Sequence, residues 1–380
     1  MFNYSVNPGY YIYNEEQYFS KLSLYNAILE AKDPYPYMTY WFHDDVFSQI
    51  DWTIEPTQSL SELYKMRAQQ IRDKYDYLIL LFSGGADSRQ VLSTFVNNNI
   101  FLDEVRTDYP VKMLEHLNPV PDPSHPYGII YEYTLAALPQ LEALKRKNLK
   151  TKITIGDNTD YFKRIGSDER ELEQNIESFI TTIPYQAVRM VEQLDQVEKY
   201  VEANNLRNVG LIYAADKPCM DLIDDRLMFF FCDIGCAAPG VNFKVQSMAK
   251  DLSRVLFYWS RECPFIPVKQ AHAIKTVIEQ NDDIRELITG PGQYNTKLKE
   301  SDLIKSIIYP SWDRRIYQKK VKHDDDHVIS YFGNTAPMEA LDKFVNQSFL
   351  NRRNDIRTRR NKHLVGSRYY DVGLVKHQVL

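Results

Sequence analysis

A short run between Ser83 and Ser88 has the residue types needed to bind a metal-bound polyphosphate. Gly84 and Gly85 have no side chains that would keep phosphate oxygens away from the backbone, and the two serines add hydroxyl donors. Asp87 would repel a bare phosphate, but its carboxylate is suited to holding Mg²⁺ that bridges to the phosphates. The run therefore predicts a site for a magnesium-bound polyphosphate.

The residues around this run predict the elements that would position it. Residues 77–82, YLILLF, form an unbroken apolar stretch typical of a strand covered on both faces, and residues 88–99 have helical spacing. Ser59 followed by Glu62 indicates the N-terminus of another helix just before the strand. In an open parallel sheet, ligands bind beyond the carboxyl ends of the strands, where the amides and dipole of the next helix favour an anion. The run lies at such a position.

The rest of this region alternates predicted strands and helices. Strands are expected at residues 102–108, 151–157 and 208–216, and helices at 137–148, 167–180 and 187–204. This order predicts an α/β fold with a mostly parallel sheet and helices on both faces.

Changes in composition and in expected secondary structure divide the chain into three regions. Residues 1–57 are rich in aromatic side chains and contain one expected helix at 15–32, which indicates a small N-terminal subdomain. Residues 58–217 form the expected nucleotide domain. Residues 218–380 are expected to contain a hairpin and an α-rich substrate region.

The run matches the pattern SGGxDS, and it lacks both the GK[ST] of a Walker A loop and the GxGxxG of a dinucleotide turn. From Ser59 to about Asn99 the chain resembles the N-type ATP pyrophosphatases, or PP-loop enzymes, which include the synthetase half of asparagine synthetase, GMP synthetase, NAD synthetase and tRNA thiolases. The resemblance implies an adenine nucleotide alpha hydrolase-like fold. It also implies an enzyme that uses ATP and Mg²⁺, transfers AMP to a carboxylate, carbonyl or amide oxygen, and releases pyrophosphate before an amine or ammonia displaces AMP.

The resemblance also implies roles for individual residues of the loop. By position, Ser83, Gly84, Gly85 and Ser88 would cradle the pyrophosphate, and Asp87 would bind Mg²⁺. Catalysis would then depend on positioning and charge stabilisation, without a protein nucleophile.

A second metal ligand is expected from a later strand, as in the GDGADE-type motif of asparagine synthetase-like members. At that place the chain has Asp216 and Lys217, which we assign as a second Mg²⁺ ligand and a phosphate contact. The glycines and the glutamate of the motif are absent, so an ordinary strand-end turn is the alternative. Asp157, at the end of another expected strand, is a rival for the same role.

Three further basic residues are candidates for contacts with the nucleotide or the intermediate. Arg89 follows the loop directly and could face phosphate or lie on the helix surface. Arg106 lies where the neighbouring strand ends, the expected place of adenine and ribose. Lys269 opens an amphipathic helix and could neutralise the adenylated intermediate, although such a lysine is more often solvated.

Composition limits the class of protein and its compartment. The net charge is -5, so the protein as a whole is not a polyanion binder, and neither a signal peptide nor a membrane span is expected. The four cysteines show no CxxC spacing, which favours buried thiols in a reducing cytoplasm over a disulfide scaffold or zinc site. A sulfur-transfer or metal role is the alternative for Cys232 and Cys236, which have CxxxC spacing. Phe2 stands where a glutaminase would have its cysteine, so we expect nitrogen from free ammonia, an amine or another protein.

The identity of the acceptor stays open between two classes of function. The first is an AMP-forming enzyme that adenylates a small molecule, or a base in tRNA or DNA. The second is a regulatory module that binds ATP without turnover and binds nucleic acid through the basic stretch 352–368. The motifs DKP and SRYYDVG, with the aromatic leader, are also similar to uncharacterised asparagine synthase-like proteins of large tailed bacteriophages, and the compartment would then be the host cytoplasm.

Overall fold

The computed structural model describes eleven stretches of the chain. They are residues 9–19, 21–33, 36–109, 111–112, 132–147, 150–160, 196–214, 218–233, 251–289, 300–313 and 365–376. Every structural statement below concerns these residues.

The centre of the molecule is a five-stranded sheet in which all neighbouring strands are parallel. In spatial order its strands are β10 (Leu252–Leu256), β7 (Val209–Tyr213), β4 (Tyr77–Leu81), β5 (Glu104–Tyr109) and β6 (Lys152–Asp157). The chain runs outward from β4 to β6, and then crosses to the other side of β4 for β7 and β10. The strand order therefore reverses between β4 and β7, and in open α/β sheets ligands bind at such a point.

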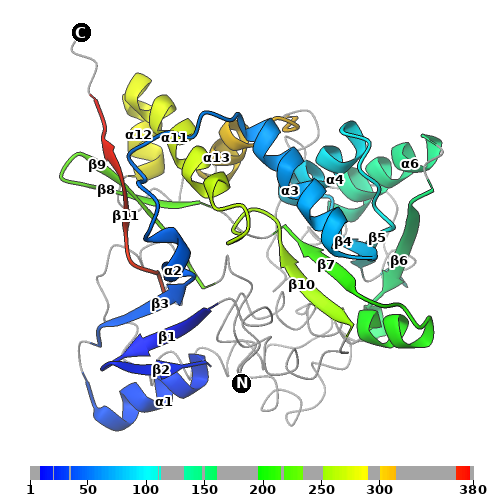
Figure 1. The fold of residues 1–380 in the computed structure, drawn as a ribbon, viewed down its shortest axis with the longest axis horizontal. Coiled ribbons are helices and arrows are strands. Elements are labelled where there is room, and N and C mark those ends of the chain that lie inside the picture. Colours follow the sequence, from blue (N-terminus) through cyan, green and yellow to red (C-terminus); the bar gives the residue numbers. More distant parts are fainter. Residues whose placement is uncertain are drawn as a thin grey trace.

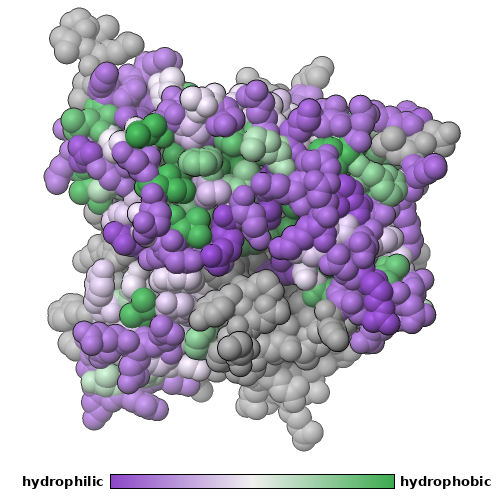
Figure 2. Space-filling model, in the orientation of Figure 1, coloured by the Kyte–Doolittle hydropathy of each residue, from purple (hydrophilic) through white to green (hydrophobic). Residues whose placement is uncertain are grey.

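Helices cover both faces of this sheet, which confirms the predicted α/β class. On one face lie α3 (Leu60–Lys74), α4 (Ala86–Asn97) and α6 (Leu138–Arg146), which the six-residue π-helix η2 (Glu132–Ala137) precedes (Figure 1). Their apolar side chains share a core with alternate residues of β4, including Leu78 and Leu80. On the other face, the helical residues 196–203 pack Val197 and Val201 against Ile79. The outward side of α3 is hydrophilic, as Figure 2 shows.

The N-terminus of α3 has the capping box that the sequence predicts. The Ser59 hydroxyl accepts a hydrogen bond from the Glu62 amide at 3.3 Å, and the Glu62 carboxylate accepts one from the Ser59 amide at 2.8 Å. Both bonds satisfy amides that the helix itself leaves without partners.

Replacing Ser59 with alanine is expected to lower the free energy of unfolding by about 1 kcal/mol, because the Glu62 amide loses its side-chain acceptor. Urea unfolding followed by circular dichroism measures this change. Ser61→Ala, at an exposed position of the same turn, is the matched control and should change the free energy by less than about 0.5 kcal/mol. An equal loss in both variants would contradict the role of the cap.

The N-terminal part is a separate three-stranded antiparallel sheet. It contains β1 (Gly9–Tyr13), β2 (Glu16–Tyr18) and β3 (Met38–Phe42), with α1 (Lys21–Ala31) between β2 and β3 and the short α2 (Asp44–Phe47) after them. The helix expected at 15–32 is therefore shorter than predicted, because residues 16–18 pair with β1 across a tight turn. Helical spacing alone does not reveal that pairing.

The region after residue 217 contributes both to the central sheet and to a third sheet. The predicted hairpin is present as β8 (Cys219–Ile223) and β9 (Arg226–Phe230), and β11 (Tyr370–Leu374) pairs with β9. Three helices follow: α11 (Phe265–Gln280), α12 (Asp282–Thr289) and α13 (Glu300–Ile308). Because β10 also comes from this region, the central sheet extends beyond the predicted boundary at residue 217.

Two of the cysteines lie close together, Cys219 in β8 and Cys232 just after β9. Cys219 and Cys232 are both buried, and their sulfur atoms are 3.5 Å apart. Cys263 is also a buried free thiol, whereas Cys236 lies outside the described residues. In the described part of the chain, no helix combines the length and the apolar character that crossing a bilayer requires.

Candidate functional site

The loop from Ser83 to Gly85 leaves the carboxyl end of β4 and opens directly into α4. Gly85 is the N-cap of the helix, and no side chain caps it. The first amides of a helix have no intrahelical acceptors, so an N-terminus without a side-chain cap is suited to an anion. The Ser83 and Ser88 hydroxyls lie beside it, 3.4 Å from each other, and the Ser83 hydroxyl also accepts a hydrogen bond from the Gly85 amide at 3.2 Å. The loop therefore gathers several donors at one end of the sheet.

Position 84 requires glycine for two reasons, its backbone conformation and the close approach of Ala137. Its φ is +79°, a conformation that side chains with a Cβ rarely adopt, and a Cβ at this position would lie 2.5 Å from the amide nitrogen of Ala137. The Gln140 amide also donates to the Gly84 carbonyl at 3.2 Å. The missing side chain of Gly84 thus makes room for the start of α6. The part that Gly84 and Gly85 would play in cradling phosphate stays a prediction.

Asp87, in the first turn of α4, is held by groups that come from the far end of the chain. The Tyr309 hydroxyl donates to its Oδ1 at 2.9 Å, the Lys305 ammonium lies 3.4 Å from its Oδ2, and the Tyr258 hydroxyl donates to its backbone carbonyl at 2.7 Å. Burial and the Asp87 carboxylate raise the pKa of Tyr309 well above its ordinary value, so this hydroxyl stays a donor. The proposed metal ligand is thus part of a buried polar cluster.

Sequence reasoning did not find Lys305, Tyr309 or Tyr258 as site residues. Their separation from Asp87, 171 residues or more, cannot be read from local spacing. The one local signal is that Lys305 and Tyr309 are four residues apart at the C-terminal end of an amphipathic helical pattern and so share a face.

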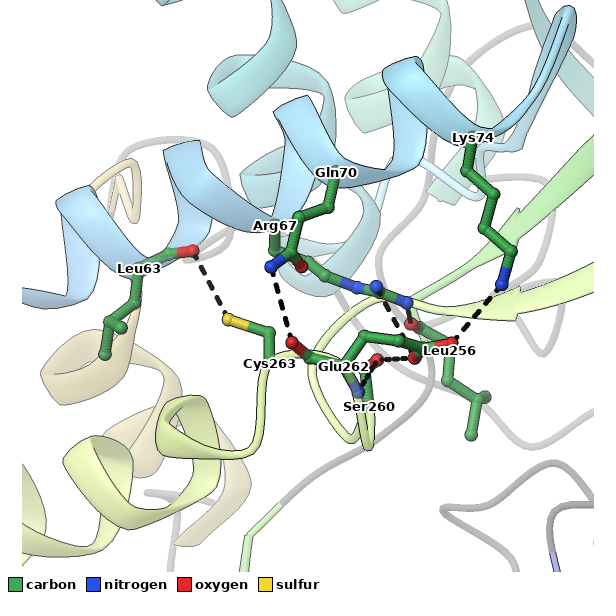
Figure 3. A network of polar contacts seen from close by, with 8 residues as sticks. All are labelled: Leu63, Arg67, Gln70, Lys74, Leu256, Ser260, Glu262 and Cys263. Carbon is green, nitrogen blue, oxygen red and sulfur yellow. Dashed lines mark hydrogen bonds and ion pairs between the residues drawn. The ribbon is translucent and has the colours of Figure 1, made fainter.

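A polar network holds the segment between β10 and α11, which includes Tyr258, against α3 (Figure 3). Arg67 donates to the Leu256 carbonyl at 2.8 Å and lies 3.7 Å from the Glu262 carboxylate, which Lys74 approaches to 3.3 Å. The Ser260 hydroxyl donates to the same carboxylate. The segment between β10 and α11, on which Tyr258 lies, is therefore tied to the helix that precedes β4.

This network predicts a dependence of stability on pH. Burial opposes ionisation of Glu262, but the Ser260 hydroxyl, Arg67 and Lys74 outweigh it and lower the pKa of Glu262 from 4.5 to about 2. Because the folded-state pKa is depressed, the stabilisation is present above about pH 4.5 and is lost as the pH falls through about 2.

Replacing Glu262 with glutamine should therefore remove this dependence. Since the side chain is half exposed, we expect a loss of about 1 kcal/mol or less at neutral pH, shrinking toward zero near pH 2. Urea unfolding at a series of pH values measures the difference. Glu142→Gln on α6 is the control, and a constant difference for Glu262→Gln across the series would contradict the assignment.

The two arginines predicted to contact the nucleotide differ in their surroundings. Arg89 is half-buried, and its Nη1 has no hydrogen-bond partner among the described residues, so a contact with phosphate stays open. Arg106 instead bonds to Asp108 at 3.3 and 3.2 Å and to Gln196 at 2.8 Å. It points to the sheet face that bears residues 196–203, whereas Tyr109 points to the other face and donates to the Ser83 carbonyl. The geometry favours a structural role for Arg106.

Lys269 contacts the segment that precedes α3. Its ammonium lies 2.6 Å from the Glu55 carboxylate and donates to the Pro56 carbonyl at 2.9 Å. These bonds tie α11 to the segment that precedes α3 and pair the Lys269 ammonium with the Glu55 carboxylate. The predicted contact of Lys269 with an adenylated intermediate stays a prediction.

Asp216 and Lys217 lie outside the described residues. The strand that precedes them in the sequence, β7, lies next to β4. β7 pairs with β4 in a register that sets Ile212 against Leu80, so the chain leaves β7 beside the strand that carries the loop. Asp157 lies at the end of β6, two strands from β4, and its Oδ1 accepts bonds from the Thr159 amide and hydroxyl at 3.0 and 2.5 Å. Asp157 therefore lies two strands from the loop-bearing strand, and Asp216 as the second acid stays a prediction.

The residues at the loop fit a magnesium site of the kind that nucleotide enzymes use. Mg²⁺ in such sites takes one or two carboxylates and completes its shell with phosphates and water. Asp87 supplies one carboxylate at the loop. In the described parts of the chain, no three or more His, Cys, Asp or Glu side chains group as the ligands of a metal ion.

Comparisons with known proteins add no assignment. The chain matches no protein-family model, and no curated protein shows significant similarity to it. The case for a function therefore rests on the loop and its place in the fold.

Proposed function

We propose that the protein binds ATP with Mg²⁺ at residues 83–88 and transfers AMP to an acceptor oxygen, releasing pyrophosphate. The observation that carries this proposal is the position of the SGGADS loop, which joins β4 to the N-terminus of α4 where the strand order reverses. Numbered by appearance within the sheet, the spatial order is 3-2-1-4-5. This order is compatible with the adenine nucleotide alpha hydrolase-like fold that the loop motif implies.

The loop brings together donors for the leaving pyrophosphate, and hydrogen bonds within the loop hold two of them, the Ser88 hydroxyl to the Gly85 carbonyl at 3.3 Å and the Gly85 amide to the Ser83 hydroxyl at 3.2 Å. The amides at the start of α4 and the Ser83 and Ser88 hydroxyls are donors, and the dipole of a 12-residue helix adds to them. Preorganised donors of this kind stabilise charge that develops in a transition state without further reorganisation. Arg89 follows the same loop directly in the sequence, and its buried Nη1 has no hydrogen-bond partner among the described residues.

In the proposed reaction, an oxygen lone pair of the acceptor forms a bond to the α-phosphorus, and the bond from that phosphorus to the α–β bridging oxygen breaks. The electron pair leaves with pyrophosphate. Asp87, with Asp216 as the second acid, would hold the metal, which would neutralise charge on the phosphates. An amine or ammonia then displaces AMP from the acceptor.

The test is product analysis with ATP labelled at the α- or γ-phosphate, in the presence of Mg²⁺ and a panel of acceptors. The panel contains amino acids with ammonia, nucleotides, tRNA and DNA. AMP and pyrophosphate formed with one class of acceptor would support the proposal and identify that class. ADP and phosphate as products would contradict it, and ATP binding without cleavage by any acceptor would favour the regulatory module.

A further inference from the structure

The Asp87 carboxylate has the ammonium of Lys305 beside it. The Lys305 ammonium lies 3.4 Å from Oδ2, and the two side chains are only 8 % and 14 % exposed. Oδ1 is engaged separately by the Tyr309 hydroxyl at 2.9 Å. Both oxygens through which Asp87 would hold a metal ion are thus in contact with groups from α13 and the residue that follows it.

The end of α13 is itself fixed against the helices around the loop. Tyr64 of α3 donates to the Ile308 carbonyl at 2.8 Å, and the Ser311 amide donates to the Gln90 side chain of α4 at 2.9 Å. The Tyr309 ring stacks on Tyr258 with ring centroids 5.3 Å apart. Lys305 therefore reaches Asp87 from a backbone that both helices hold in place.

An ammonium and a divalent cation cannot share this carboxylate without cost. Two cations near one buried acid repel each other strongly in a medium of low dielectric constant. Conversely, a buried carboxylate without a nearby cation is destabilised, so it gains more from a metal ion. Lys305 and the metal should therefore compete for Asp87.

We propose that Lys305 is the counter-cation of Asp87 and that a divalent cation must displace it to bind there, so that α13 sets the metal affinity of the loop. This inference rests on the proposed function in one respect, the use of Asp87 as a metal ligand. It goes beyond that function because it assigns control of metal binding to a helix more than 200 residues away in the chain.

The experiment measures binding of Mn²⁺ alone, from the loss of its free electron paramagnetic resonance signal, to wild-type protein and to Lys305→Met. We expect the variant to bind Mn²⁺ about tenfold more tightly than wild type, since removal of a competitor is a coupling free energy of ordinary size. Mn²⁺ should also raise the melting temperature of the variant more than that of wild type. Lys305→Gln is the second variant, should Lys305→Met fold poorly.

Two controls connect the effect to this site. Lys275→Met removes an ammonium of similarly low exposure from α11, where it bonds to the Val372 carbonyl and lies 4.0 Å from Glu279, and its Mn²⁺ affinity should equal that of wild type. Adding Asp87→Asn to Lys305→Met should abolish the tightened binding. An unchanged or weaker affinity in both Lys305 variants would overturn the inference.

The inference and the proposed function can fail separately. The metal titration contains no ATP, so it does not depend on nucleotide cleavage. AMP formation by wild type together with unchanged Mn²⁺ affinity in the Lys305 variants would overturn the counter-cation alone. Tightened Mn²⁺ binding in a protein that forms ADP would support the counter-cation while contradicting the proposed cleavage.

Discussion

Replacing Asp87 with asparagine is expected to lower the rate of Mg²⁺-dependent pyrophosphate release from ATP by about 100-fold or more. Asparagine has nearly the same size and can still accept the hydrogen bond from Tyr309, but it cannot supply the negative charge that holds a metal. The measurement is kcat/KM for release of labelled pyrophosphate, with circular dichroism to show that the variant is folded.

The same substitution also leaves the Lys305 ammonium without its carboxylate, so a loss of stability has to be separated from a loss of catalysis. Removing one partner of a buried ion pair is destabilising, whereas replacing both partners with neutral residues costs much less. The double variant Asp87→Asn, Lys305→Met should therefore regain stability without regaining activity. Asp73→Asn on the exposed face of α3 is the control for a neutralised acid. Near wild-type turnover by either Asp87 variant would remove Asp87 from the mechanism.

Replacing Gly84 with alanine is expected to lower the free energy of unfolding by about 2–4 kcal/mol and to weaken ATP binding by at least about tenfold. The left-handed backbone at φ +79° disfavours alanine, and the new methyl group would lie 2.5 Å from the Ala137 amide nitrogen. Relief of that contact has to move either the loop or the start of α6, and a displaced loop no longer aligns its donors. Urea unfolding and a direct titration with ATP measure the two effects.

Gly373→Ala separates backbone strain from damage to the site. Gly373 also has a positive φ, +100°, but its nearest neighbour is the flexible end of Lys275 at 3.3 Å, in the third sheet. This variant should lose stability and keep the wild-type affinity for ATP. Wild-type stability and ATP affinity in Gly84→Ala would contradict the close packing of the loop against α6.

The parts of the fold that local sequence determines were predictable. The apolar run before the loop, the capping box at Ser59 and the helical spacing after Ser88 depend on neighbours within a few residues, and the structure has the expected strand and helices. The shortened first helix shows the limit, because residues 16–18 pair with β1 instead of continuing α1. Pairing between segments is decided by tertiary contacts that override local propensity.

The candidate site was predictable only where it is contiguous in sequence. The loop residues follow from their types and spacing, but the contact of Lys305 and Tyr309 with Asp87 requires the chain to fold back over more than 200 residues. Arg106 was assigned to the nucleotide from its place at a strand end. Its pairing with Asp108 depends on the alternation of side chains along β5, which sets both on the face opposite Tyr109.

The most direct test of the central claim is a structure of the protein with Mg²⁺ and the α,β-methylene analogue of ATP, which cannot be cleaved between the α- and β-phosphates. We predict that the β- and γ-phosphates lie within hydrogen-bond distance of Ser83, Gly85 and Ser88 and that Asp87 coordinates the metal. Nucleotide bound elsewhere, or at the loop with its phosphates away from α4, would contradict the assignment of this loop as the pyrophosphate site.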